Sequence, residues 1–144
     1  MYKFIKYLFI CLLFVAPTVM FAQEQTKEEM DREKQFRENI DKMVENYEND
    51  LKLEGWQVFY VDSILTHDFT ALSEELKQMS KAKVENSDLY QAVQDKWMEQ
   101  MYNAFHQVLD EQQWARYLKN GASKNKKNRD KRAANRQSND TGRH

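Results

Sequence analysis

Residues 87–109 read SDLYQAVQDKWMEQMYNAFHQVL, and their apolar side chains recur at the three- and four-residue spacing of an α-helix. They form two adjacent stripes: Tyr90, Val93, Trp97, Met101, Ala104 and Val108, and Met98, Tyr102, Phe105 and Leu109. An apolar arc of this width indicates a helix that is buried between neighbours, or one that turns half of its arc towards a partner. Ser87 is a suitable N-cap for this helix, and Asp88 is favourable in its first turn.

Two amphipathic helices are predicted before this segment. Apolar residues at helical spacing predict one helix over 27–51, with Thr26 and Glu29 as a capping box, and another over 54–82. Glycine and proline are nearly absent between residues 23 and 120, where Gly55 is the only example of either, so long helices are favoured.

A short helix is predicted to follow over 111–120, with Asp110 as its N-cap and Gly121 ending it. The sequence therefore predicts an all-α fold, a small bundle of about four helices built as long amphipathic hairpins. That domain would occupy residues 23–120.

The amino terminus has the pattern of a secretory signal peptide. Two lysines and no acid precede a mostly apolar, uncharged run at 7–21, and Ala22 stands before a strongly polar stretch. The run of 15 residues is shorter than the ~20 that a spanning helix needs. We expect residues 1–22 to be removed near Ala22 and the rest to be periplasmic; an uncleaved anchor is the alternative.

Charge divides the remaining chain into two segments. Residues 23–118 hold 21 acidic and 11 basic side chains, a net charge of −10, whereas residues 119–144 hold 9 basic and 2 acidic, a net charge of +7. Residues 121–144 contain no large apolar side chain, so we expect a disordered basic tail. This tail would contact anionic lipid, or stay solvated, or fold back on the acidic body; export argues against a nucleic acid partner.

No pattern typical of catalysis is present. Residues 23–144 lack cysteine, and His67 and His106 stand outside any metal-binding spacing. Acid pairs such as Glu74–Glu75 are neighbours in sequence and point about 100° apart on a helix, so they do not face each other. We expect neither an enzyme active site nor a cofactor.

Two five-residue segments carry a resemblance to a known family. Leu53-Glu54-Gly55-Trp56-Gln57 and Leu109-Asp110-Glu111-Gln112-Gln113 each open a predicted helix, 56 residues apart. They resemble the paired Leu-Thr-x-x-Gln motifs of periplasmic proteins of the Spy and CpxP type, with the threonine replaced in both copies. The resemblance covers about residues 27–120.

The motif has a physical interpretation at each position. Leu53 and Leu109 would anchor the preceding segment in the core, and Gln57 and Gln113 would hydrogen-bond back across the helix start. The residue between them caps the helix, which Asp110 does well and Glu54 does poorly. These five positions, without Glu54, are the motif residues that we expect to matter: Leu53, Gln57, Leu109, Asp110 and Gln113.

The resemblance implies a thin, curved, helical homodimer that binds unfolded clients without ATP or responds to envelope stress. Client-binding surfaces in the family combine positive charge with apolar residues, whereas this body is acidic. Some relatives are associated with zinc. The alternative is a non-catalytic regulatory subunit that docks one specific envelope protein.

Aromatic side chains are the other feature relevant to binding. Twelve lie between Phe36 and Tyr117, and most should be in the core. Tyr60, Trp97 and Tyr102 lie at the edges of apolar stripes, so they are the candidates for exposure and for client binding.

Overall fold

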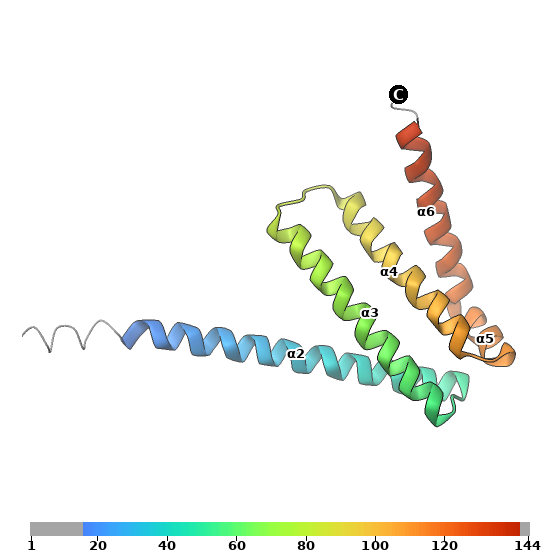
Figure 1. The fold of residues 1–144 in the computed structure, drawn as a ribbon, viewed down its shortest axis with the longest axis horizontal. Coiled ribbons are helices and arrows are strands. Elements are labelled where there is room, and N and C mark those ends of the chain that lie inside the picture. The colour runs from blue at the N-terminus through green and yellow to red at the C-terminus, as the bar shows by residue number, and fades with distance from the viewer. Residues whose placement is uncertain (1–15, 142–144) are drawn as a thin grey trace, which may run out of the picture. The chain divides into compact units, whose positions relative to one another are not determined.

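The computed structural model describes the backbone of residues 16–141 and the side chains of residues 27–138, and the regular structure of this part is entirely helical (Figure 1). The chain divides into two compact units, one ending at Asn39 and the other beginning at Ile40. Helix α2 (Ala16–Leu51) spans this boundary and contributes its last turns to the second unit. The all-α fold predicted from the sequence is confirmed.

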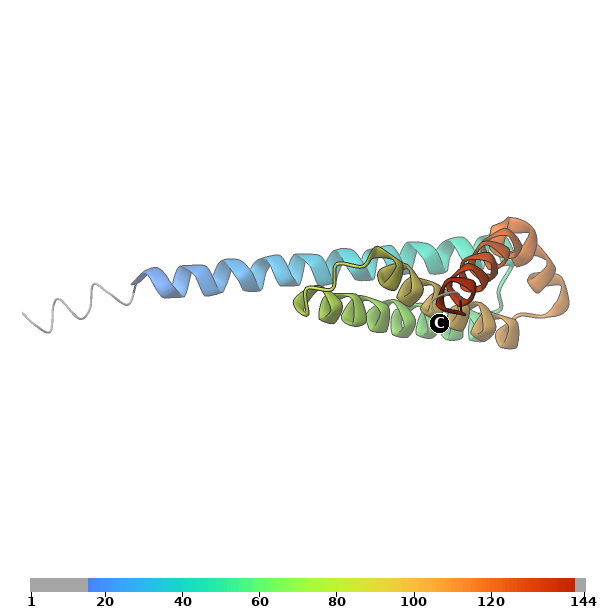
Figure 2. The same ribbon diagram turned by 90° about the horizontal axis from the view of Figure 1, so that it is seen from above.

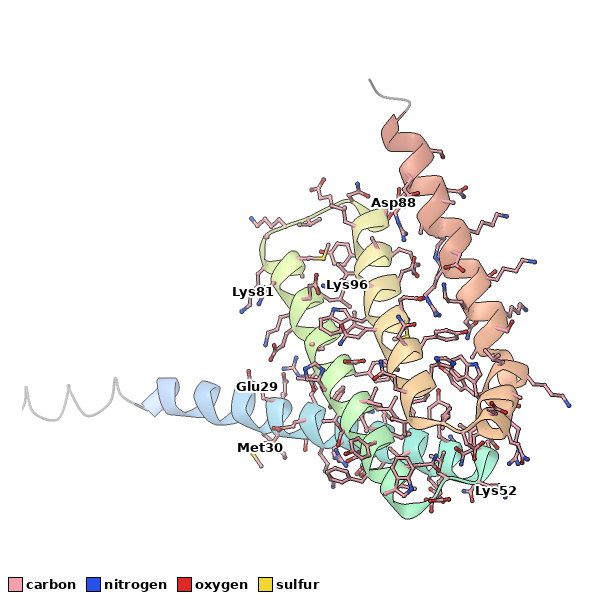
Figure 3. The ribbon with its side chains drawn as sticks, turned by 45° about the vertical axis from the view of Figure 1, so that its right-hand side comes forward. Glu29, Met30, Lys52, Lys81, Asp88 and Lys96 are labelled. Atoms are coloured by element: carbon pink, nitrogen blue, oxygen red, sulfur yellow. The ribbon has the colours of Figure 1, made fainter. Side chains whose placement is uncertain are left out.

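Helices α3 (Gly55–Lys81) and α4 (Ser87–Val108) pack side by side as an antiparallel hairpin (Figure 1). The side chain of Asn86, one residue before the predicted cap, accepts a hydrogen bond of 2.9 Å from the backbone N–H of Asp88. Lys96 projects from α4 towards α3 and binds the Glu75 carboxylate at 2.6 Å (Figure 3). The hairpin therefore has the two long helices that the apolar stripes predict.

Helix α5 (Glu111–Tyr117) leads through a π-helical segment, η1 (Leu118–Ala122), into helix α6 (Ser123–Thr141). Gly121 lies within η1 with φ of 114°, a conformation that residues with a Cβ rarely adopt. The helical path breaks there, which confirms the predicted end of the short helix. Beyond the break, α6 lies against α4 (Figures 1 and 2).

The core of the second unit lies where the end of α2 meets α3, α4 and α5. Its most buried side chains come from the predicted stripes: Ile40, Leu51, Val61, Leu65 and Phe105. The Tyr47 ring meets the Phe105 ring edge-on at 5.1 Å and lies 6.0 Å from the Tyr117 ring. Burial among these core rings raises the pKa of Tyr47 and of Tyr117.

The carboxy-terminal segment differs from the expectation of a disordered tail. Residues 123–141 form helix α6, and the last three residues of the expected tail, 142–144, lie outside the described part of the chain. The reason is that ordering here does not depend on apolar burial: alanine, lysine and arginine favour helix, and the arginines pair with carboxylates of α4. Of the alternatives, folding back on the acidic body is the one observed.

The start of α2 also differs from the sequence prediction. In the described part of the chain the helix reaches back to Ala16 rather than starting near residue 27, because no residue from 18 to 26 is a helix breaker. The expected cleavage position at Ala22 lies inside this helix. Of the predicted signal peptide, residues 1–15 lie outside the described part of the chain. Within the described residues, no helix has the length and apolar character needed to cross a membrane.

Candidate functional site

The two motif glutamines bind each other in the interior of the second unit. Gln57 donates from Nε2 to Oε1 of Gln113 at 2.6 Å, and Gln113 donates from Nε2 to Oε1 of Gln57 at 2.8 Å. Only 3% of Gln57 and 5% of Gln113 is exposed. The two motifs, 56 residues apart in the chain, thus meet at one point.

The surroundings of the pair repeat on both sides. Each amide nitrogen also donates to the backbone carbonyl that precedes the other motif: Gln57 to Val108 at 3.0 Å, and Gln113 to Lys52 at 3.2 Å. Each Oε1 also accepts the backbone N–H of its own cap residue, Glu54 at 2.8 Å or Asp110 at 3.0 Å. We call this group of bonds the glutamine clasp. It joins the turn between α2 and α3 to the turn between α4 and α5.

The remaining motif residues lie where the motif's mechanics require. Leu109 is buried and Leu53 is half-buried. Asp110 accepts the Gln113 backbone N–H at 2.8 Å, and both helix starts have a capping box. A carboxylate oxygen of Glu54 also accepts the indole N–H of Trp56 at 2.7 Å. The glutamines and Asp110 therefore act as the sequence predicts.

Next to the clasp, the first turns of α3 carry three exposed aromatic residues. Trp56 is 53% exposed, Phe59 is 67% exposed and Tyr60 is 51% exposed. Tyr60 lies between the other two rings, 6.0 Å from Trp56 and 5.8 Å from Phe59, edge-on to both. We call these three residues the aromatic cluster; large rings are rarely this exposed together unless they bind something.

Of the three aromatic residues predicted to be exposed, only Tyr60 is. Trp97 is half-buried and donates its indole N–H to Glu75 at 2.7 Å, which together with Lys96 lowers the pKa of that carboxyl. Tyr102 is half-buried between the Trp114 ring, at 4.9 Å, and the guanidinium of Arg129. Both rings lie on α4 and face neighbouring helices, so they are not part of the aromatic cluster.

A shallow cavity of about 260 Å³ continues from Tyr60 along the groove between α3 and α4. Its inner wall includes Asp68, which is buried and accepts a hydrogen bond from Gln100 at 2.9 Å. Nδ1 of His67 lies 2.8 Å from the same carboxylate oxygen. The groove thus extends the exposed surface of α3 beyond the aromatic cluster with polar groups.

On the opposite side of α4, carboxylates hold the arginines of α6. Arg132 and Arg136 both bind Asp95, at 2.5 and 3.1 Å, and Arg129 binds Glu99 at 3.1 Å. Burial raises the pKa of Asp95, but the hydrogen bonds from the two arginines lower it by more, so the net shift is downward. Asp95 therefore stays ionised in this pairing.

His67 and His106, the histidines in the described part of the chain, each lie beside another polar or aromatic side chain. Across the described residues, no group of three or more histidine, cysteine or carboxylate side chains is placed to hold a metal ion. His67 is paired with Asp68, and the His106 ring lies 4.5 Å from that of Trp114 on α5.

Comparison with known proteins adds no assignment: no protein-family model, no characterised protein and no solved structure matches the chain.

The sequence did not lead us to predict that Trp56 and Phe59 are exposed, or that the arginines of α6 bind carboxylates of α4. The first two stand beside the motif in a segment rich in aromatics, and their positions fall off the apolar stripe of Val61 and Leu65. That offset was the available signal. The spacing of Arg129, Arg132 and Arg136, three and four residues apart, was a second signal, because it places all three on one face of a helix.

Proposed function

We propose that this chain is an exported, ATP-independent chaperone-like protein that holds unfolded client segments on the aromatic cluster. The observation that carries the proposal is the exposure of Trp56, Phe59 and Tyr60 side by side at one end of a helical hairpin. Unfolded proteins expose apolar and aromatic side chains, which bury surface against such a cluster.

The glutamine clasp supports this role by fixing the position of the cluster. Gln57 lies one residue after Trp56 and two before Phe59, and its side chain is bound on both sides. The start of α3 is thereby held to the turn before α5, so the exposed rings are presented from an ordered backbone. Ordering the surface in advance reduces the entropy lost on binding.

The resemblance to Spy and CpxP type proteins agrees with the proposal, because both glutamine motifs are retained and paired. Binding would be loose, since three aromatic residues and a shallow groove bury little area compared with a stable interface. Loose binding suits a protein that must release unrelated clients without ATP.

The test is suppression of aggregation by residues 23–144, mixed at near-equal ratio with a chemically denatured client in the absence of ATP. We expect the protein to reduce light scattering, and the variant Trp56→Ser, Phe59→Ser, Tyr60→Ser to lose most of that activity. The matched control is Met30→Ser with Leu89→Ser, which removes two apolar side chains of comparable exposure elsewhere (Met30 is labelled in Figure 3).

Full activity in the triple variant would exclude the aromatic cluster as the client site. No suppression by the unmodified protein would contradict the chaperone role and favour a subunit that docks one dedicated partner. Circular dichroism of each variant establishes that the helices are retained.

A further inference from the structure

Helix α6 is held to α4 by charge rather than by apolar packing. The described part of the helix contains no apolar side chain larger than alanine, and Ala133 and Ala134 are exposed. Among the side chains described for α6, at 123–138, only that of Arg129 is buried, at 8% exposed. Its guanidinium lies over the Tyr102 ring while binding Glu99. A segment of this composition can stay docked only while the carboxylates of α4 attract it.

The surface of α4 under this helix combines acids with apolar groups. Asp95 and Glu99 are one helical turn apart and both face α6, with Met98 and Tyr102 half-buried on the same side. A cavity of about 310 Å³ remains between the two helices, where Asn125 and Asn128 of α6 face Gln94 and Met98 of α4. The fit between α6 and α4 is therefore incomplete.

The basic residues of α6 divide into those that contact α4 and those that are exposed. Arg129, Arg132 and Arg136 face α4, and each guanidinium gives two hydrogen bonds to a carboxylate. Lys126 also contacts α4, 3.3 Å from Glu99. The exposed lysines, at positions 124, 127 and 131, lie roughly 140° around the helix from the arginines, as follows from ~100° per residue. The planar guanidinium can give a carboxylate two hydrogen bonds, as all three arginines do here, so the arginines supply most of the polar contact with α4.

We propose that this face of α4, formed by Asp95, Met98, Glu99 and Tyr102, is a binding surface for arginine-bearing helical segments of other polypeptides. Helix α6 occupies it in cis, and an incoming basic segment takes its place. The acids of this face complement the charge of such a segment, and one segment of that chemistry is already seated there. This surface is separate from the aromatic cluster, and its test does not depend on suppression of aggregation.

Exchange of α6 is physically accessible for two reasons. The ion pairs are partly open to solvent, with side-chain exposures of 41% for Arg132 and 34% for Arg136, so water and salt compete for them. Gly121, at φ of 114°, interrupts the helix just before α6, so α6 can leave without disturbing α5. Residues that anchor α5, such as Gln113, lie on the other side of this break.

The experiment measures binding of a fluorescent peptide of residues 119–141 to residues 23–144 by anisotropy at low salt. In the unmodified protein, α6 competes for the surface. In the variant Arg129→Ala, Arg132→Ala, Arg136→Ala, the competitor is weakened, and we expect the peptide to bind roughly tenfold more tightly, because the competent fraction rises. Adding Asp95→Asn and Glu99→Gln to this variant should abolish binding.

The control variant Lys124→Ala, Lys127→Ala, Lys131→Ala removes the same charge from the outer face of α6. It should bind the peptide as the unmodified protein does. An equal gain in the lysine variant, or retention of binding after Asp95 and Glu99 are replaced, would overturn the proposal.

A second measurement uses the unmodified protein and avoids any loss of folding in the variants. Excess unlabelled peptide should speed hydrogen exchange at the amides of residues 124–138 severalfold, as α6 is displaced. A scrambled peptide of the same composition, without the arginine spacing, should not. Equal acceleration by both peptides, or by neither, would contradict a surface that recognises the arginine face.

Discussion

The glutamine clasp predicts how replacing Gln57 or Gln113 changes the stability of the protein. Replacing Gln57 with leucine removes both hydrogen bonds between the two buried amides and the bond that the Val108 carbonyl accepts, while Gln113 keeps its bonds to Lys52 and Asp110. Each single Gln→Leu change should therefore lower the free energy of unfolding by about 1–3 kcal/mol. The double variant should lose less than the sum, with a coupling energy of about 1 kcal/mol or more. Urea denaturation of the four proteins measures this cycle.

Gln112→Leu is the matched control for that cycle, because this neighbouring glutamine is exposed. Its effect should stay within about 0.5 kcal/mol. Additive effects of Gln57 and Gln113 would show that the two amides do not depend on each other.

Two residues after the end of α3, Lys83 adopts a backbone conformation that is unfavourable for residues with a Cβ. Lys83 has φ of 55°, and the following Val84 N–H binds the Met79 carbonyl at 3.1 Å, a helix-ending pattern in which glycine is preferred. Lys83→Gly should therefore raise the free energy of unfolding by about 0.5–1 kcal/mol, because the left-handed conformation costs glycine little. Lys81→Gly, inside the last turn of α3, should lower it by a similar amount. Thermal or urea denaturation that ranks the two variants the other way would contradict this assignment.

The docking of α6 on α4 should depend on pH through Asp95. Its pKa in the folded protein lies below the ordinary value of 3.8, so folding favours the ionised carboxyl. The stability that Asp95 contributes is fully present above pH 3.8 and is lost as pH falls through the lowered pKa. Asp95→Asn should cost about 1–2 kcal/mol near neutral pH, and the difference from the unmodified protein should vanish in stronger acid. A difference that persists at low pH would assign the effect to packing instead.

For the protein as a whole, apolar periodicity was enough to predict the body of the fold. The stripes of 27–51, 54–82 and 87–108 became helices α2, α3 and α4, because burial of one face decides such segments. The glutamine spacing predicted the bonds to the cap residues, which are local. The bonds between Gln57 and Gln113 could not be predicted, because they depend on how α2, α3, α4 and α5 pack.

Helix α6 marks the limit of the same reasoning. No large apolar side chain follows Leu118, so apolar content predicts no ordered segment there. Asp95 and Glu99 of α4 nevertheless bind the arginines of α6, which composition alone does not show. Exposure of the aromatic cluster was only partly predictable, since Tyr60, Trp97 and Tyr102 all lie at stripe edges and neighbouring helices cover two of them. Side-chain surroundings, rather than side-chain type, decide which ring meets solvent.

The clasp also has a consequence for the order in which the protein assembles. The α3–α4 hairpin can form from residues close in sequence, but Gln57 and Gln113 meet only when both ends of the hairpin and the start of α5 are in place. Closing a loop of that length costs chain entropy before any bond repays it. We therefore expect the clasp to form late, after the α3–α4 hairpin.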